Sequence, residues 1–335
     1  MCIRDRTKHN RQNDSCFRIK NTGNCFGRRT DEKGNTATFK NVRFEQMKQL
    51  YEQQKTLDKN FLIKKIDEFI LEDKANNDIT TKHLPPNNET RTAYIVCEEP
   101  MIFAGEQILK HIFEKEKYII YKEDGKNCEP GDIIAEAQAP QEYLLTRERI
   151  LLNLLQRLSG IASLTAQYIK AANNEKIKIL DTRKTTPGLR VFEKYAVTVG
   201  GGYNHRMDLE VGSMFKDNHL ILSNKFTHLI QTFSNKHPNK KLQIEVDHYK
   251  QLTSILHSIT CKLDAILLDN MNPNEAKDCI NLIRKTQPEC FIELSGGINL
   301  HTIENFSSLD LDGISVGALT HQAQSKNIKL EIKKT

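Results

Sequence analysis

The sequence predicts an α/β protein in which a mixed α/β domain is followed by a parallel α/β barrel. Short apolar strands alternate with helical segments over the second half of the chain, a pattern typical of parallel sheets with helical crossovers. Six of these strands end in a charged or glycine-rich cluster. Barrel enzymes build their sites from such strand ends, whereas a doubly wound sheet, the alternative, would concentrate these residues at one switch point. The barrel is therefore favoured.

The first segment, residues 1–45, is poor in apolar residues and rich in Asn, Arg, Thr and Gly. It shows no periodicity, and we expect a disordered extension. An N-terminal targeting tail is the alternative, but the mixture of acidic and basic residues argues against it.

Apolar periodicity begins at residue 46 and predicts a first folded domain over residues 46–160. Residues 61–74 place five apolar side chains on one helical face. Residues 146–172 predict either one long amphipathic helix or two helices broken at Gly160. Strands are expected within 91–105, 116–125 and 129–140.

The barrel domain is expected over residues 161–325. Helical stretches such as 249–261 and 274–286 separate several of its strands. The strands are expected at 177–181, 197–202, 213–218, 242–247, 265–270, 291–297 and 313–319.

Composition excludes several classes of function. The net charge of +6 over 335 residues is mild and spread along the chain, so nucleic-acid binding is not implied. No apolar run reaches the roughly 18 residues of a membrane helix, and the N-terminus lacks the apolar core of a secretory signal. The eight cysteines form no C-x-x-C pair, which indicates a cytoplasmic, reducing compartment and no zinc site.

Five basic residues follow the predicted strands and would converge at the mouth of the barrel. They would repel one another unless an anion lay between them. Arg grips a carboxylate or phosphate through paired hydrogen bonds, and Lys acts as a point charge. The sequence therefore predicts a ligand with several negative charges, bound by Arg183, Lys184, His205, Arg206 and Lys216.

Acidic and glycine-rich strand ends complete the predicted site. Glu245 and Asp269 end neighbouring strands and could hold Mg²⁺ or the hydroxyls of a sugar. The glycines of "SGGI" (295–298) and "VGAL" (316–319) would let backbone N–H groups approach a phosphate closely. Neither a P-loop motif nor a dinucleotide fingerprint is present. The residues alone predict a polyanion site without naming its substrate.

Several motifs together closely resemble the quinolinate phosphoribosyltransferase family. They are "LEDKANNDITTKHLP", "ERILLNLLQRLSGIAS", "ILDTRKTTPGLRVFEKYAV", "GGGYNHRMDL", "FKDNH", "IEVD", "LLDNM", "SGGINL" and "ISVGALTH", and they span about residues 46–330. The resemblance implies an N-terminal α/β sandwich domain and an open seven-stranded α/β barrel. We also expect that the C-terminal tail could pack back on the N-terminal domain. It implies a pentosyltransferase that makes nicotinate mononucleotide, pyrophosphate and CO₂ from quinolinate and phosphoribosyl pyrophosphate (PRPP) in NAD biosynthesis, with Mg²⁺.

The resemblance also implies residue roles. Lys184, Lys216, Glu245 and Asp269 would be catalytic, and both acids would lie near the metal and ribose. Arg149 would reach the quinolinate site of a partner subunit in a homodimer or higher homo-oligomer. The remaining substrate-binding positions are Thr182, Arg183, His205, Arg206, Ser295, Gly296, Gly297, Val316, Gly317 and Ala318.

Two other functions remain open on sequence grounds. One is a related phosphoribosyltransferase acting on another base, such as nicotinate, although a monocarboxylate needs fewer cationic donors. The other is a catalytically silent barrel that serves in binding or assembly, and the complete set of motif charges argues against it. Gln243 departs from the family pattern, since many members have an acidic residue there.

Overall fold

The computed structural model describes residues 29–30, 36–37, 39–84, 89–216, 219 and 226–333. The chain divides into two compact units, Met1–Phe39 and Lys40–Thr335. In the first unit, strands β1 (Arg29–Thr30) and β2 (Thr36–Ala37) pair antiparallel. Helix α1 spans Phe39–Gln46. The expected disordered extension is thus helical over its last residues, 39–45, and residues 1–28 lie outside the described residues.

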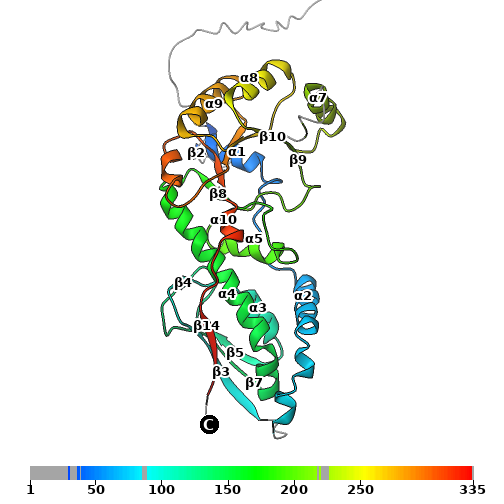
Figure 1. The fold of residues 1–335 in the computed structure, drawn as a ribbon, viewed down its shortest axis with the longest axis vertical. Coiled ribbons are helices and arrows are strands. Elements are labelled where there is room, and N and C mark those ends of the chain that lie inside the picture. The colour runs from blue at the N-terminus through cyan, green and yellow to red at the C-terminus, as the bar shows by residue number, and fades with distance from the viewer. Residues whose placement is uncertain are drawn as a thin grey trace, which may run out of the picture. The chain divides into compact units, whose positions relative to one another are not determined.

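The first half of the second unit is an antiparallel sheet covered by helices (Figure 1). Its strand order is β14-β3-β7-β5, with β3 at Thr90–Cys97, β5 at Lys117–Ile120, β7 at Ile133–Pro140 and β14 at Ile328–Ile332. The three predicted strand regions are confirmed. The C-terminal tail supplies β14, which pairs antiparallel with β3. The smaller elements here are α2 (Lys59–Glu72), η1 (Ala75–Asn77), η2 (Thr81–His83), β4 (Met101–Ile102), α3 (Glu106–Ile112) and β6 (Asn127–Cys128).

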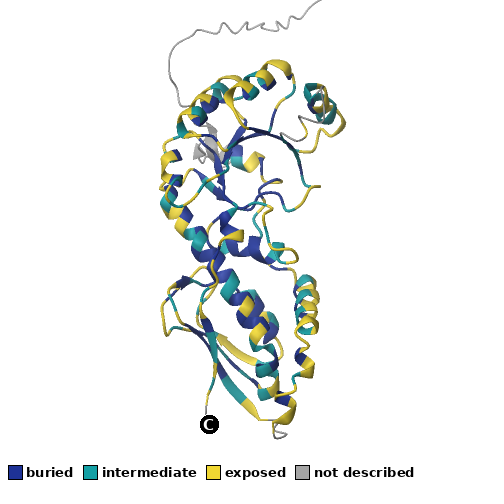
Figure 2. Cartoon of the chain, viewed as in Figure 1, coloured by how far each residue is buried: buried dark blue, intermediate teal, exposed yellow. Residues whose placement is uncertain are grey.

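Helix α4 (Gln141–Ala172) is continuous over 32 residues, which confirms the single long helix and excludes the alternative break at Gly160. Gly160 instead permits a close backbone contact, because a Cβ there would collide with the carbonyl oxygen of Gln324 in the C-terminal tail. The side chain of Gln156 donates to the carbonyl of Ile328 at 2.8 Å. The helix runs along the antiparallel sheet and continues beside the barrel, as its buried face shows (Figure 2). It therefore crosses the expected domain boundary at residues 160 and 161.

The second half is a parallel sheet of six strands in the order β8-β13-β12-β11-β10-β9. The end strands β8 and β9 are not paired with each other within the described ranges, so the barrel is open. The strands are β8 (Lys178–Leu180), β9 (Ser213–Phe215), β10 (Leu242–Val246), β11 (Ala265–Asp269), β12 (Phe291–Ser295) and β13 (Gly313–Ser315).

The predicted strand at 197–202 is wrong, which is why six strands replace the expected seven. Residues Arg190–Val199 form helix α5, which ends at Gly200. Phe192, Tyr195 and Ala196 are buried at helical spacing, and the β-branched residues of "VTV" are only its last turn. A short apolar run of this kind cannot be assigned to helix or strand by periodicity alone. The other barrel elements are α7 (Phe226–Lys236), α8 (Tyr249–Ser258), α9 (Pro273–Thr286), η3 (Ile303–Phe306) and α10 (Ala318–His321).

Residues 43–51, which we call the N-terminal plug, pack into the barrel core. Met47, Leu50 and Tyr51 are buried against a group that includes Ala265 and Phe291, the first residues of β11 and β12. An ion pair also holds the plug in place. The buried carboxylate of Asp312 lies 2.8 Å from Arg43 of the plug and 2.7 Å from Arg284 of the barrel. The sequence had divided this segment between the extension and the first domain. None of the helices in the described ranges is long and apolar enough to cross a membrane.

Candidate active site

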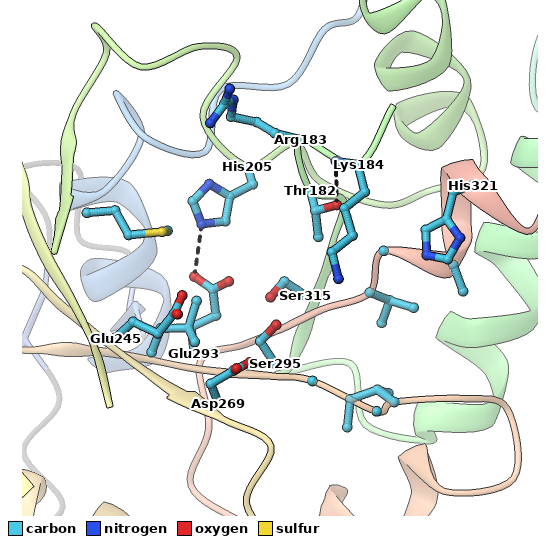
Figure 3. Close-up of a pocket in the computed structure, with 18 of the residues that line it drawn as sticks. Thr182, Arg183, Lys184, His205, Glu245, Asp269, Glu293, Ser295, Ser315 and His321 are labelled. Carbon is cyan, nitrogen blue, oxygen red and sulfur yellow. Dashed lines mark hydrogen bonds and ion pairs between the residues drawn. The ribbon is translucent and has the colours of Figure 1, made fainter. Parts of the chain in front are cut away.

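A cavity of about 680 Å³ opens at the carboxyl ends of the barrel strands (Figure 3). Parallel strands bring their ends to one edge of the sheet, so residues distant in sequence meet there. Every predicted site residue except Arg149 lines this cavity. These are Thr182, Arg183, Lys184, His205, Arg206, Lys216, Glu245, Asp269, Ser295, Gly296, Gly297, Val316, Gly317 and Ala318.

A buried ion pair joins the two loops that carry most of the cations. Asp181 directly follows β8 and pairs with Lys194 of α5, and neither side chain is exposed. Asp181 also accepts from the backbone N–H of His205 at 2.7 Å and from the side chain of Asn204 at 2.7 Å. Burial raises the pKa of Asp181 and lowers that of Lys194, so each charge depends on its partner. The pair thereby fixes the 204–206 loop against the strand that leads into Arg183.

His205 and Arg206 are almost fully buried at the cavity wall, whereas Arg183 and Lys184 are exposed. One Arg206 Nη donates to the carbonyl of Gly212 at 2.8 Å, and the side chain lines the cavity, where its other N–H groups can donate to a ligand. Burial lowers the pKa of Arg206, and the nearby charge of Arg183 lowers it further. A buried cation next to a second cation is stabilised by an anion in the cavity.

Acidic side chains form another wall. Lys216 Nζ, on a half-exposed side chain, lies 2.6 Å from Glu245 Oε2. Burial raises the pKa of Glu245, and Lys216 opposes that shift. Carboxylate oxygens of Glu245, Asp247 and Asp269 all lie within 4.8 Å of one another. Asp247 was not predicted; it directly follows β10, which ends at Val246.

Two glycine loops bring backbone close to the cavity. Gly296 and Gly297 have φ values of +86° and +65°, which favour glycine. A Cβ on Gly296 would also collide with Asn270, and one on Gly317 would lie 2.9 Å from Cδ of Lys184. Any other residue at Gly296 or Gly317 would therefore disturb the cavity wall.

The floor contains a buried acid, Glu293, which belongs to one of the six polar strand ends that the sequence predicts but was given no individual role there. A charged residue in the middle of the apolar strand "FIELS" was the available signal. Burial alone would raise the pKa of Glu293, but His205 and the Tyr51 hydroxyl oppose burial, and the pKa is lowered to about 2. Other lining residues that the sequence did not single out are Met214, Leu267, Ile298, Asn299, Ser315, His321 and Gln322.

Arg149 is exposed on α4 and does not reach this cavity within its own chain. It lines a separate cavity of about 500 Å³, together with residues of α2, α4 and α5 such as Phe69, Leu154 and Phe192. Its predicted role in a partner subunit's site stays a prediction.

Fold and cavity together define a barrel enzyme with a polyanion site. Family models named "Quinolinate phosphoribosyl transferase" match the chain at residues 78–159 for the N-terminal domain and 161–331 for the C-terminal domain. The chain belongs to the quinolinate phosphoribosyl transferase family.

Individual relatives agree with this assignment. A probable nicotinate-nucleotide pyrophosphorylase [carboxylating] of Bacillus subtilis is 37% identical over 276 residues, 81% of this chain and 93% of that protein. The nicotinate-nucleotide pyrophosphorylase structure from Ehrlichia chaffeensis is 35% identical with a TM-score of 0.74, covering 80% of this chain and 97% of that one. The Francisella tularensis structure is 28% identical with a TM-score of 0.75, covering 84% and 99%.

Proposed function

We infer that this chain converts quinolinate and PRPP to nicotinate mononucleotide, pyrophosphate and CO₂ in NAD biosynthesis. The observation that carries the inference is one cavity that joins five basic side chains, an acidic wall and two glycine loops. That combination suits a dicarboxylate beside a sugar phosphate. The names of the relatives across both family domains support the same reaction.

Quinolinate would bind at the cationic wall. Its two adjacent carboxylates need several donors, and the Arg206 guanidinium can offer paired N–H groups from a buried position. Lys184 reaches into the cavity from the loop after β8 (Figure 3). Lys216 already forms an ion pair with Glu245, so its ammonium group would contact both Glu245 and a quinolinate carboxylate.

PRPP would bind across the acidic wall and the glycine loops. Glu245 and Asp269 would accept hydrogen bonds from ribose hydroxyls, and backbone N–H groups of 295–297 and 316–318 would contact phosphate oxygens. The oxygen donors of Glu245, Asp247 and Asp269 fit Mg²⁺, which prefers one or two carboxylates plus substrate phosphates. Bound there, Mg²⁺ would neutralise the leaving pyrophosphate.

The chemistry follows from this placement. The pyridine nitrogen lone pair forms a bond to the anomeric carbon, and the bond to pyrophosphate breaks with its electron pair leaving on oxygen. The bond from C2 to its carboxylate then breaks, CO₂ departs, and the electron pair on C2 takes up a proton. Positive charge on the ring nitrogen stabilises that carbanion. The side chains contribute positioning and charge complementarity to the transition state.

We also propose a homodimer or higher oligomer located in the cytoplasm. Arg149 is an exposed cation outside its own chain's site, which suits a role in a partner subunit. The five described cysteines are free thiols, which suits a reducing compartment.

Mixing inactive Arg149→Ala subunits with inactive Lys184→Ala subunits should restore part of the activity. No recovery in heterodimers of verified composition would refute a shared site.

One assay tests the function. Purified protein is incubated with PRPP, Mg²⁺ and either quinolinate or nicotinate, and the nucleotide and CO₂ are measured. Quinolinate should give nicotinate mononucleotide with one CO₂ released per nucleotide. Turnover of nicotinate but not of quinolinate would indicate the related transferase. Turnover of neither substrate would indicate a catalytically silent barrel.

A further inference from the structure

The N-terminal plug carries Tyr51 to the underside of the cavity floor. The Tyr51 side chain is 1% exposed, and its ring lies 4.7 Å from the ring of Phe291 and 5.2 Å from that of His205, centroid to centroid. The contact with His205 is edge-on, at 87° between the planes. Tyr51 therefore touches a cavity residue without lining the cavity itself.

The Tyr51 hydroxyl fixes the orientation of Glu293. It donates to Glu293 Oε2 at 2.7 Å, and Gln243 Nε2 donates to the same oxygen at 2.8 Å. Burial and the Glu293 charge both raise the pKa of Tyr51, so the hydroxyl keeps its proton and acts as the donor. Oε1 of the carboxylate has no hydrogen-bond partner among the described residues. Two donors on one oxygen hold the carboxylate in a single rotational position.

Glu293 in turn faces His205. The Nδ1 atom of His205 accepts the backbone N–H of Arg206 at 2.7 Å, so the ring proton of the neutral imidazole lies on Nε2. That Nε2 is 3.4 Å from Glu293 Oε2, longer than an ordinary hydrogen bond (Figure 3). The carboxylate thus favours one tautomer while leaving the N–H only loosely engaged.

We propose that Tyr51 is a positioning residue for the pyridine dicarboxylate: by holding the Glu293 carboxylate that faces Nε2, it fixes the orientation of the His205 imidazole beside Arg206. This inference rests on the proposed function. Tyr51 and Glu293 are 242 positions apart, so the N-terminal plug supports the substrate site from a distant part of the sequence. Because His205 lies on the cationic wall, loosening it should affect quinolinate more than PRPP.

Tyr51→Phe in the full chain removes only the hydroxyl and keeps the ring packing. We expect the KM for quinolinate to rise about tenfold, the loss typical of one hydrogen bond to a charged group, with the KM for PRPP changed less than about twofold. Tyr195→Phe is the matched control, since it removes another buried hydroxyl that is bonded to Asp124, which does not line the cavity. The control should change neither KM by more than about twofold.

Imidazole ¹⁵N shifts report the tautomer independently of turnover, with the His205 signal assigned by its loss in His205→Asn. In the wild type Nδ1 should be unprotonated. In Tyr51→Phe the Nε2 signal should shift, because the carboxylate that faces it has lost one of its two donors, whereas Nδ1 should stay unprotonated because the Arg206 N–H still bonds to it. An unchanged His205 spectrum, or equal rises of both KM values, would overturn the proposal. Should Tyr51→Phe not fold, Gln243→Met removes the second donor, and an unchanged quinolinate KM there refutes it equally. Wild-type protein that does not turn over quinolinate refutes the proposed function instead.

Discussion

Replacing Arg206 tests the cationic wall most directly, because this guanidinium is 7% exposed and sits beside a second cation. Arg206→Ala would remove paired hydrogen bonds to a carboxylate, each worth about 1.5–3 kcal/mol when a charged group takes part. A loss of roughly 3–4 kcal/mol corresponds to a fall in kcat/KM for quinolinate of several hundredfold. Arg206→Lys keeps the charge without the planar fork, and a fall of about tenfold is expected.

The assay is the initial rate of nicotinate mononucleotide release at varied quinolinate and saturating PRPP. Arg206→Ala also leaves the Gly212 carbonyl without its side-chain donor, so stability should fall by about 1–2 kcal/mol, visible as a lower Tm. Lys262→Ala is the control, since it removes only an exposed ion pair with Glu289 and should leave the rate unchanged. Near-normal kcat/KM for a folded Arg206→Ala would refute the reasoning about the cavity.

Three further predictions concern packing, pH and metal. Gly160→Ala should lower the free energy of unfolding by about 1–3 kcal/mol, because the added Cβ collides with the Gln324 backbone. The control Lys170→Ala, on the exposed face of α4, should change it little, and equal Tm values for the two variants would contradict the close contact. The lowered pKa of Glu293 means that its ionised form stabilises the fold above the unfolded-state pKa near 4.5, and this contribution should disappear as the pH falls toward about 2. Glu293→Gln should therefore show a shallower loss of stability across that acid range, and a slope identical to the wild type would count against it. Chelation with EDTA should abolish nucleotide formation and added Mg²⁺ should restore it, while undiminished activity in chelator would exclude the proposed metal role.

Much of the site was predictable from the sequence because parallel strands share one carboxyl edge. "DTRK", "IEVD" and "SGGI" each follow or end an apolar run, so their side chains had to meet if the runs formed neighbouring strands. "NHR" reaches the same edge from the end of a helix, through the bonds of its loop to Asp181. The 197–202 segment was misassigned because a short apolar run does not distinguish a helix end from a strand. The continuity of the helix through Gly160 was left open because local sequence does not report a close tertiary approach.

The amino-acid sequence by itself determined the cationic and acidic walls, since charge type and strand-end position are local properties. Only the tertiary structure decided that Tyr51 and Gln243 lie beneath Glu293 and orient it toward His205. The physical reason is that buried hydrogen bonds join residues whose separation along the chain, 242 positions for Tyr51 and Glu293, leaves no periodic pattern. The position of Arg149 in a separate cavity was likewise decided by how α4 packs and not by its neighbours in sequence.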